Sequence, residues 1–261
     1  MYKLYWGNGI PHKNLIHDVL MIQAWNPEFA LSFNYPGWSL SVECFFYIAF
    51  PFLFNHIYKK KPFNWVLVFS LILWGATQLF IHAFIELGYY QPSPDLSHYF
   101  LYFFPGLHVN EFIIGNVAGL FYLNFLTKKQ LNIDWLVLVL MCVLCLALVW
   151  PSQLMFHNGL YAVIFGPLIL AISVNKGFIT KVFEQKGLVL LGEISFGIYI
   201  LQYPVFDFVT QYLLSVGVED KMLIFYITLI VLVMVSTLSF FFIESPLRKY
   251  INGLGKNKKF V

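Results

Sequence analysis

The sequence has little charge, a single arginine and three cysteines among its 261 residues. Asp, Glu, Lys and Arg together make up 11% of the chain, whereas a soluble domain carries about 25%. Because 59% of the residues are hydrophobic and the mean hydropathy is +0.72, the chain lacks the polar surface that a water-soluble fold needs. Ordinary soluble, collagen-like and disordered classes are therefore excluded, and the composition indicates a membrane protein.

The few charges and cysteines also narrow the chemistry. Cys44, Cys142 and Cys145 lie inside apolar stretches, so neither a disulfide bond nor a metal site is expected. The net charge of +3 comes from short basic tracts between apolar runs, which is a pattern of membrane topology and not of nucleic-acid binding. The first residues lack a basic stretch followed by an apolar one, so no cleavable signal peptide is expected.

Long apolar runs predict the fold. The hydrocarbon core of a bilayer is about 30 Å thick, so a crossing helix needs about 20 mainly apolar residues. We therefore expect an all-α, polytopic transmembrane bundle with about seven spans. These spans cover residues 38–58, 64–87, 109–126, 135–150, 159–174, 188–214 and 222–243.

Basic residues predict the orientation of these spans. Thirteen of the 16 Lys and Arg residues follow the first, third, fifth and seventh spans. Since Lys and Arg near span ends prefer the cytoplasm, the N-terminus is expected outside and the C-terminus inside. Residues 1–37 are then an external or interfacial segment, 38–249 a membrane domain and 250–261 a basic cytoplasmic tail. Polar residues interrupt 15–33, which favours an interfacial helix or the outer end of a further span over a complete crossing.

Ionisable groups inside a membrane cost about 2.5 to 3.5 kcal/mol each, so each of them needs a reason. Ser39, Glu43 and Tyr47 are spaced four residues apart, which aligns them on one face of the first predicted span. This face suits a hydroxylated substrate or a proton acceptor. The structural alternative is that Glu43 forms a hydrogen bond across helices and that Ser39 caps the helix start.

A second polar face lies on the sixth predicted span. Ser195, Tyr199 and Gln202 share this face, and Pro204 is expected to kink the helix and free a carbonyl near Ile200. A packing role is favoured here over a catalytic one.

Three further features are each interpreted structurally. His82, inside an apolar run, is expected to be a packing residue, and Glu111, near an interface, is expected to be satisfied by solvent or by snorkelling. Gly115 and Gly119 form a GxxxG pattern, which allows a close approach of two helices.

Three separated segments, read together, resemble conserved segments of one enzyme family. They begin at Trp38, Leu191 and Phe242 and read WSLSVE, LGEISFGIYILQYP and FIESPLR. In this order they are similar to the W-S-L-S-x-E, i-S-Y-x-x-Y-L-x-H-x-P and F-I-E-x-P-x-R segments of the acyltransferase 3 family. The stretch 105–115 is also similar to the family's P-x-x-x-x-x-E-F-x-x-G, with Glu111 in place.

The resemblance implies a function. Members of this family have about ten spans and move an acyl group from a cytoplasmic acyl-CoA to a hydroxyl outside the cell. We therefore expect a multi-pass protein of the inner membrane that transfers an acyl group, most simply acetyl, to a surface sugar or polysaccharide. Acyl-CoA is its donor substrate and no bound cofactor is expected. Glu43 and Ser39 are the catalytic candidates, and the substrate-binding candidates are Trp38, Tyr47, Glu111, Ser195, Tyr199 and Gln202.

Two departures from the family keep alternatives open. The family's general-base histidine and an arginine-containing motif precede the W-S-L-S-x-E segment, and the sequence begins just short of that point. Gln202 also stands where the family has histidine. The alternatives are an inactive remnant, a subunit that needs a polypeptide carrying the missing spans, and a component of polysaccharide transport or export.

Overall fold

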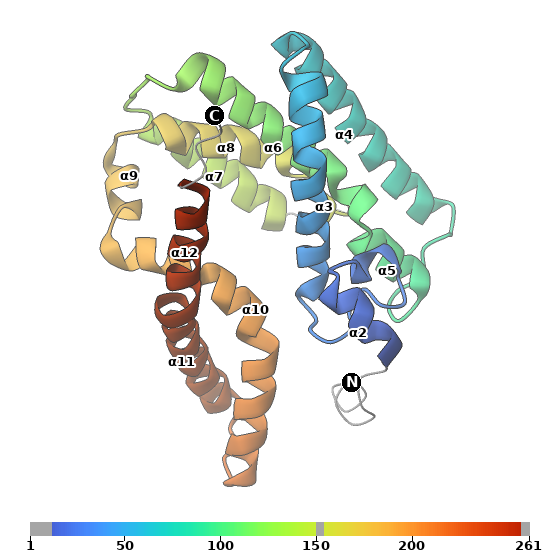
Figure 1. Ribbon diagram of the computed structural model, residues 1–261, viewed down its shortest axis with the longest axis vertical. Helices are drawn as coiled ribbons and strands as arrows, with labels where there is room; N and C mark the ends of the chain where they lie inside the picture. The colour runs from blue at the N-terminus through green and yellow to red at the C-terminus, as the bar shows by residue number, and fades with distance from the viewer. Residues whose placement is uncertain (1–11, 150–153, 257–261) are drawn as a thin grey trace. The chain divides into compact units, whose positions relative to one another are not determined.

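The computed structural model describes residues 12–149 and 154–256, and over these residues it is built from helices (Figure 1). No β-strand occurs in these two stretches, and the pairing of Leu131 with Asn175 is an isolated bridge. Parts of the predicted N-terminal segment, fourth span, following connection and C-terminal tail lie outside the described residues. In chain order the elements are α2 (His12–Val19), η1 (Gln23–Trp25), α3 (Gly37–Leu53), η2 (Phe54–Tyr58), α4 (Phe63–Glu86), α5 (Leu96–Phe103), η3 (Pro105–His108), α6 (Val109–Phe121), η4 (Tyr122–Leu126), α7 (Asp134–Val149), α8 (Ala162–Val174), α9 (Phe178–Phe183), α10 (Lys186–Ser215), α11 (Lys221–Ser239), η5 (Phe240–Glu244) and α12 (Ser245–Lys256).

The helical membrane bundle predicted from the sequence is confirmed. Five helical stretches in the described residues are long and apolar enough to cross a bilayer: Gly37–Tyr58, Phe63–Glu86, Leu96–Leu126, Lys186–Ser215 and Lys221–Gly253. The other two predicted spans coincide with apolar helices of 16 and 13 residues, α7 and α8. At 1.5 Å per residue these helices are about 24 and 20 Å long, which is less than the hydrocarbon thickness. The count of seven crossings and their orientation stay predictions.

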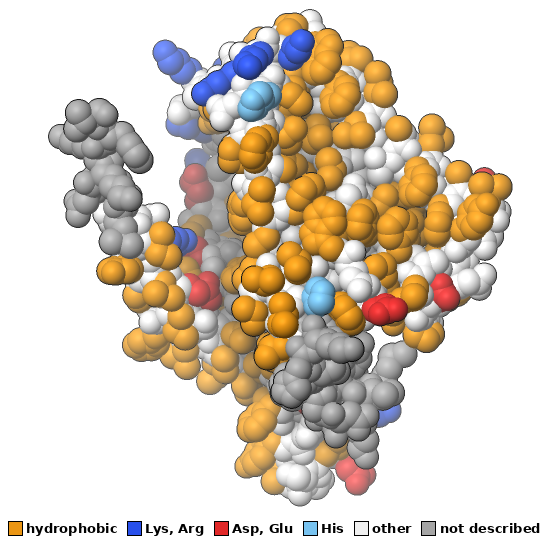
Figure 2. Space-filling model, turned by 45° about the vertical axis from the view of Figure 1, so that its right-hand side comes forward, with side chains coloured by type: hydrophobic (Ala, Val, Ile, Leu, Met, Phe, Trp, Pro, Cys, Tyr) orange, Lys and Arg blue, Asp and Glu red, His pale blue; other side chains and the backbone are white. Residues whose placement is uncertain are grey.

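Three spans change their winding where basic residues follow. The α-helices α3, α6 and α11 continue into the π-helical turns η2, η4 and η5. In each case the next polar stretch is one of the basic tracts that the sequence places in the cytoplasm. Figure 2 shows hydrophobic side chains over most of the face in view, with Lys and Arg side chains gathered at the end where α3 meets α4. Exposed Lys59, Lys60 and Lys61 form this turn.

The chain divides into two compact units, which we describe separately. Unit 1 comprises Met1–Phe33 and Gly37–Val182, and within it α6 packs against both α4 and α8 while α7 packs against α8. Buried apolar residues form two clusters in this unit. One contains Ile81, Leu101, Leu107 and Met155, and the other contains Val137, Leu168 and Ala171.

The segment before α3 is short and irregular. Helix α2 has eight residues, so the described part of 15–33 contains no complete crossing, as predicted. The Gln23 amide donates to the Gly37 carbonyl at 2.7 Å, and the Ala24 N–H donates to the Ser41 hydroxyl at 3.4 Å. These bonds fix the segment to the first turns of α3.

Burial raises the pKa of Asp18, and the hydrogen bond from Ser32 partly offsets this shift.

Unit 2 comprises Asn34–Pro36 and Phe183–Val261, and its main contact is between α10 and α11. A side chain on Gly197 of α10 would come within 3.2 Å of Glu244 Oε1 and 3.3 Å of Ser236 Cβ. The small residue at this position therefore allows the close approach of the two helices.

Pro204 explains why the tripeptide Asn34–Pro36 belongs to unit 2. Because proline has no N–H, it leaves the carbonyl of Ile200 without its donor within α10. The Asn34 side-chain amide donates to this carbonyl at 3.0 Å, which confirms the predicted free acceptor. The rings of Tyr35 and Tyr203 stack with centroids 4.8 Å apart, and the Tyr199 hydroxyl donates to the Pro36 carbonyl at 3.3 Å. Residues 34–36 are thus held on α10, in part by the Ile200 carbonyl that Pro204 leaves free.

This pairing makes a prediction for stability. Asn34→Ala leaves the Ile200 carbonyl without a donor and is expected to cost about 1–3 kcal/mol of unfolding free energy. In a Pro204→Ala background the new N–H of residue 204 replaces the donor, so the same Asn34→Ala change is expected to cost less by about 1 kcal/mol. Unfolding of the four proteins in one mild detergent measures the difference. Equal costs of Asn34→Ala in both backgrounds would show that Asn34 does not replace the donor that Pro204 lacks.

Candidate functional site

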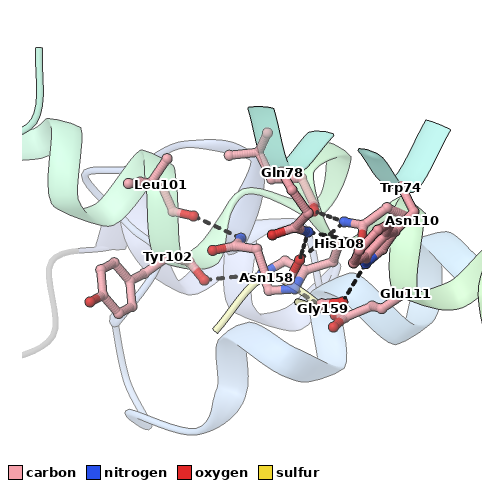
Figure 3. A network of polar contacts seen from close by, with 10 residues as sticks. Trp74, Gln78, Leu101, Tyr102, His108, Asn110, Glu111, Asn158 and Gly159 are labelled. Carbon is pink, nitrogen blue, oxygen red and sulfur yellow. Dashed lines mark hydrogen bonds and ion pairs between the residues drawn. The ribbon is translucent and has the colours of Figure 1, made fainter. Parts of the chain in front are cut away.

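A buried histidine lies at the centre of a polar network in unit 1 (Figure 3). Only 2% of His108 is exposed. Its Nε2 lies 3.0 Å from the Tyr102 carbonyl oxygen and its Nδ1 lies 2.7 Å from Glu111 Oε1. A carbonyl oxygen only accepts, so Nε2 carries a proton and donates to Tyr102. His108 Nδ1 and the Glu111 carboxyl group therefore share the second proton, either as an ion pair or as two neutral groups.

The break between α5 and α6 positions this pair. Helix α5 ends at Phe103, and Pro105 stands in the first turn of η3, where its missing N–H costs nothing. The chain then turns through His108 into α6, which places Glu111 in the first turn of that helix. A carboxylate is favoured there by the partial positive charge of the helix N-terminus. We expected solvent or snorkelling to satisfy Glu111. The structure corrects this expectation, because the Glu111 carboxyl group is bonded to His108.

Trp38 packs against the rings around this pair. Its ring centroid lies 5.3 Å from that of His108, 5.5 Å from that of His157 and 5.1 Å from that of Phe103. The first residue of the WSLSVE segment therefore contacts two histidines, one in η3 and one before α8. The predicted substrate-binding residues Trp38 and Glu111 are brought together through His108.

His157 is the second titratable ring of the site. Burial lowers the pKa of its imidazole, and nearby His108 lowers it further. The ring therefore favours its neutral form, in which one nitrogen donates and the other accepts. Its Nε2 is buried and has no hydrogen-bond partner among the described residues. A buried nitrogen without a partner is costly, and a turn of the ring would bring it to a ligand.

The loop that carries His157 is fixed by hydrogen bonds from helix α4. The Trp74 indole N–H donates to the Gly159 carbonyl at 2.9 Å, and the Gln78 amide donates to the Asn158 carbonyl at 2.8 Å. His82 also holds the loop, since its Nε2 accepts from the Met155 N–H at 3.2 Å and its Nδ1 lies 2.7 Å from the Gln78 carbonyl. These bonds give His82 the structural role predicted for it.

A groove of about 670 Å³ opens beside the pair. Glu111 and His157 lie at one end of its lining, and Tyr122 and Ser173 are the last lining residues of the α6–η4 helix and of α8. Gly115 and Gly119 also line it, and a Cβ atom on either would meet nothing within 4 Å in the described structure. The close helix approach that this GxxxG pattern allows is therefore not found among the described residues. Here the missing side chains leave the groove open.

Glu43 and Tyr47 lie at a different and smaller pocket of about 370 Å³. Phe46, Phe50 and Phe112 complete its lining, and the rings of Phe46 and Phe112 stack with centroids 4.3 Å apart. No hydrogen bond to the Glu43 carboxylate occurs within the described part of the chain, so the predicted bond across helices is not found. Ser39 lies inside the first turn of α3, which begins at Gly37, and is not the residue that precedes the helix.

The remaining predicted site residues belong to unit 2. Besides the bond of Tyr199 to Pro36, the Ser195 hydroxyl donates to the Gly192 carbonyl at 2.7 Å and the Gln202 amide donates to the Tyr199 carbonyl at 3.0 Å. All three side chains are thus engaged with backbone carbonyls of their own unit.

Sequence reasoning missed His157 and underrated His108. The spacing of His108 and Glu111, three residues apart just after Pro105, is a signal that could have paired them. No comparable signal marks His157, because its neighbours come from α3, α5 and η3, far away in the sequence.

Apolar helices around a buried imidazole, its half-buried carboxyl partner and a groove define a polytopic membrane protein with a polar site. The family model described as an acyltransferase domain matches residues 2–243, and the chain belongs to this acyltransferase 3 family. The chain is similar to the O-acetyltransferase OatA of Staphylococcus aureus strain NCTC 8325 and to that of strain MRSA252. Each is 25% identical over 228 residues, covering 81% of this chain and 36% of the relative. The chain thus spans about a third of the length of these curated relatives. No solved structure matches it.

Gly159 makes the geometry of the site testable. Its φ of +76° disfavours any side chain, and a Cβ atom would lie 2.7 Å from both Asn110 Oδ1 and Glu111 Cβ. Gly88 has a similar φ of +80° with nothing within 4 Å among the described residues. Gly88→Ala is expected to cost about 1 kcal/mol of unfolding free energy, and Gly159→Ala about 1–3 kcal/mol more because Glu111 and Asn110 must move. Unfolding curves in detergent measure the free energy of unfolding of both variants. Equal losses in Gly88→Ala and Gly159→Ala would show that Gly159 does not pack closely against Glu111.

Proposed function

We propose that this chain forms part of a membrane O-acyltransferase that moves an acetyl group from acyl-CoA in the cytoplasm to a hydroxyl of a cell-surface sugar. Membership of the acyltransferase 3 family is the observation that carries this proposal. The likeness to proteins named O-acetyltransferase supports acetyl as the transferred group. A multi-pass location in the inner membrane fits the five long apolar helices and is part of the same proposal.

The reaction needs a hydroxyl acceptor and a proton acceptor. The acceptor oxygen attacks the thioester carbonyl, its proton passes to a base, and the thiol of CoA leaves with a proton. Such general-base assistance is worth about 10² to 10⁴ in rate. Among the predicted catalytic residues, Glu43 has the carboxylate for this task, with Ser39 one turn away on the same helix. We propose that Glu43 orients the acceptor or its base.

The two substrates would approach from opposite sides. Exposed Lys59, Lys60 and Lys61 follow the first span, on the side predicted to be cytoplasmic, and they can attract the phosphates of acyl-CoA. His157 and Gly159 lie in or near a connection predicted to be outside, where a surface sugar is available. The donor and acceptor sites would then meet inside the bundle.

A carboxylate-to-amide exchange tests the proposal. The natural full-length protein that contains this chain is expressed in its own host with Glu43→Gln, and ester-linked acetate on the surface polysaccharide is measured after release with mild base. We expect acetylation to fall about 100-fold or more, because the amide cannot take a proton. Glu86→Gln, which removes an exposed carboxylate at the end of α4, is the matched control and should retain acetylation.

If Glu43→Gln retains full acetylation, Glu43 has no role in the reaction. If the unaltered protein adds no acetate to the polysaccharide, the proposed reaction itself is wrong.

A further inference from the structure

The groove end formed by Glu111 and His157 combines two kinds of surface. The Glu111 side chain is 34% exposed although one of its oxygens is held by His108, and the buried Nε2 of His157 has no partner in the described structure. Beside them, Phe156 is 57% exposed and its ring stacks on Tyr161 with centroids 6.0 Å apart and planes at 11°. Hydrogen-bonding groups therefore lie next to an open aromatic face.

The charges of the groove restrict what it can bind. Among the described residues that line it, Glu111 is the only one with an acidic side chain, and neither Lys nor Arg is present. His108 already pairs with Glu111, so a phosphate or a nucleotide in the groove would find no free cation to bind it. The groove therefore disfavours the phosphates of CoA and favours a neutral ligand that donates hydrogen bonds to a carboxylate.

A hydroxyl group satisfies both polar residues. It donates to the Glu111 carboxylate, and because it both donates and accepts, it can pair with His157 Nε2 in either neutral tautomer of the ring. A sugar also carries apolar C–H faces, which pack on exposed aromatic rings such as Phe156 and Phe165. A volume of about 670 Å³ falls within the roughly 300–1,000 Å³ typical of small-molecule sites.

We propose that the Glu111–His157 end of this groove binds a sugar unit of the acyl acceptor, with the Glu111 carboxyl group and, after a turn of the imidazole ring, His157 Nε2 bonded to its hydroxyls and Phe156 packed on its ring. This inference rests on the proposed function for the identity of the sugar as acceptor. It assigns to His157 a binding role, distinct from the role proposed for Glu43.

Two matched variants of His157 test the proposal. His157→Phe keeps a planar ring but removes the hydrogen-bonding nitrogen, whereas His157→Gln can place an amide group near the position of Nε2. The natural full-length protein is purified in detergent, and the probe is a de-O-acetylated oligosaccharide prepared from the surface glycan of its host. Calorimetry gives the dissociation constant, and acetyl transfer to the same probe gives kcat and KM.

We expect His157→Phe to raise the dissociation constant and the KM for the oligosaccharide about tenfold, which corresponds to the loss of one hydrogen bond. Its kcat should stay within about threefold of the original value, and His157→Gln should recover most of the binding. His56→Phe is the control and should change neither constant, because His56 lies in η2, where its ring bonds the Phe52 carbonyl.

A second change tests the groove without touching a polar group. Gly115 lies one helical turn from Glu111, and a Cβ atom there meets nothing within 4 Å in the described structure. Gly115→Leu should fold, fill the groove and weaken oligosaccharide binding by about tenfold or more. This variant keeps the proposal testable if His157→Phe proves unstable.

The outcomes separate the two proposals. Binding of the oligosaccharide that depends on His157, in a protein that transfers no acetyl group, would support the sugar site and refute the proposed reaction. Acetyl transfer that is unchanged in His157→Phe and Gly115→Leu would support the reaction and overturn the sugar site. A fall of kcat in His157→Phe with an unchanged KM would also overturn it, as would failure of the unaltered protein to bind the probe.

Discussion

The hydrogen bond between His108 Nδ1 and the Glu111 carboxylate, 2.7 Å long, sets the geometry of the candidate site. In a medium of low dielectric constant a buried imidazole without a partner is costly, so the His108 ring requires the half-buried Glu111 carboxyl group. The Tyr102 carbonyl fixes the proton on the opposite ring nitrogen, and thereby fixes the orientation of the ring. Trp38 then packs on a histidine that cannot rotate freely, and Glu111 faces the groove with its remaining exposed surface.

The same constraint explains the loop that completes the groove. A buried loop must satisfy its carbonyls within the protein, because an unpaired buried carbonyl is costly. Trp74 and Gln78 of α4 supply the donors for Gly159 and Asn158, and Gly159 gives the backbone the positive φ that brings it against Glu111. His157 is carried to the groove by this loop. The site is therefore assembled from α3, α4, η3, α6 and one loop, with buried hydrogen bonds joining them.

The sequence predicted those features that depend on local chain properties. The long spans follow from the match between helix length and bilayer thickness, and the free carbonyl of Ile200 follows from the missing N–H of Pro204. The donor to that carbonyl, Asn34, lies 166 residues away and could not be found from local pattern. For the same reason His157 was missed, since its neighbours are distant in the sequence. The GxxxG pattern of Gly115 and Gly119 allows a close helix approach, but a small-residue pattern does not tell whether a helix or an open groove lies opposite.

The most direct test of this account is a double-mutant cycle on His108 and Glu111, measured as unfolding free energies in a single detergent. If the two side chains share a proton, His108→Phe and Glu111→Leu should each cost about 1–3 kcal/mol, because neither replacement can hydrogen-bond to the partner that remains. The double variant should then cost much less than the sum of the two, with a coupling of about 1 kcal/mol or more. Additive losses would contradict the account, because they would show that the two groups do not depend on each other.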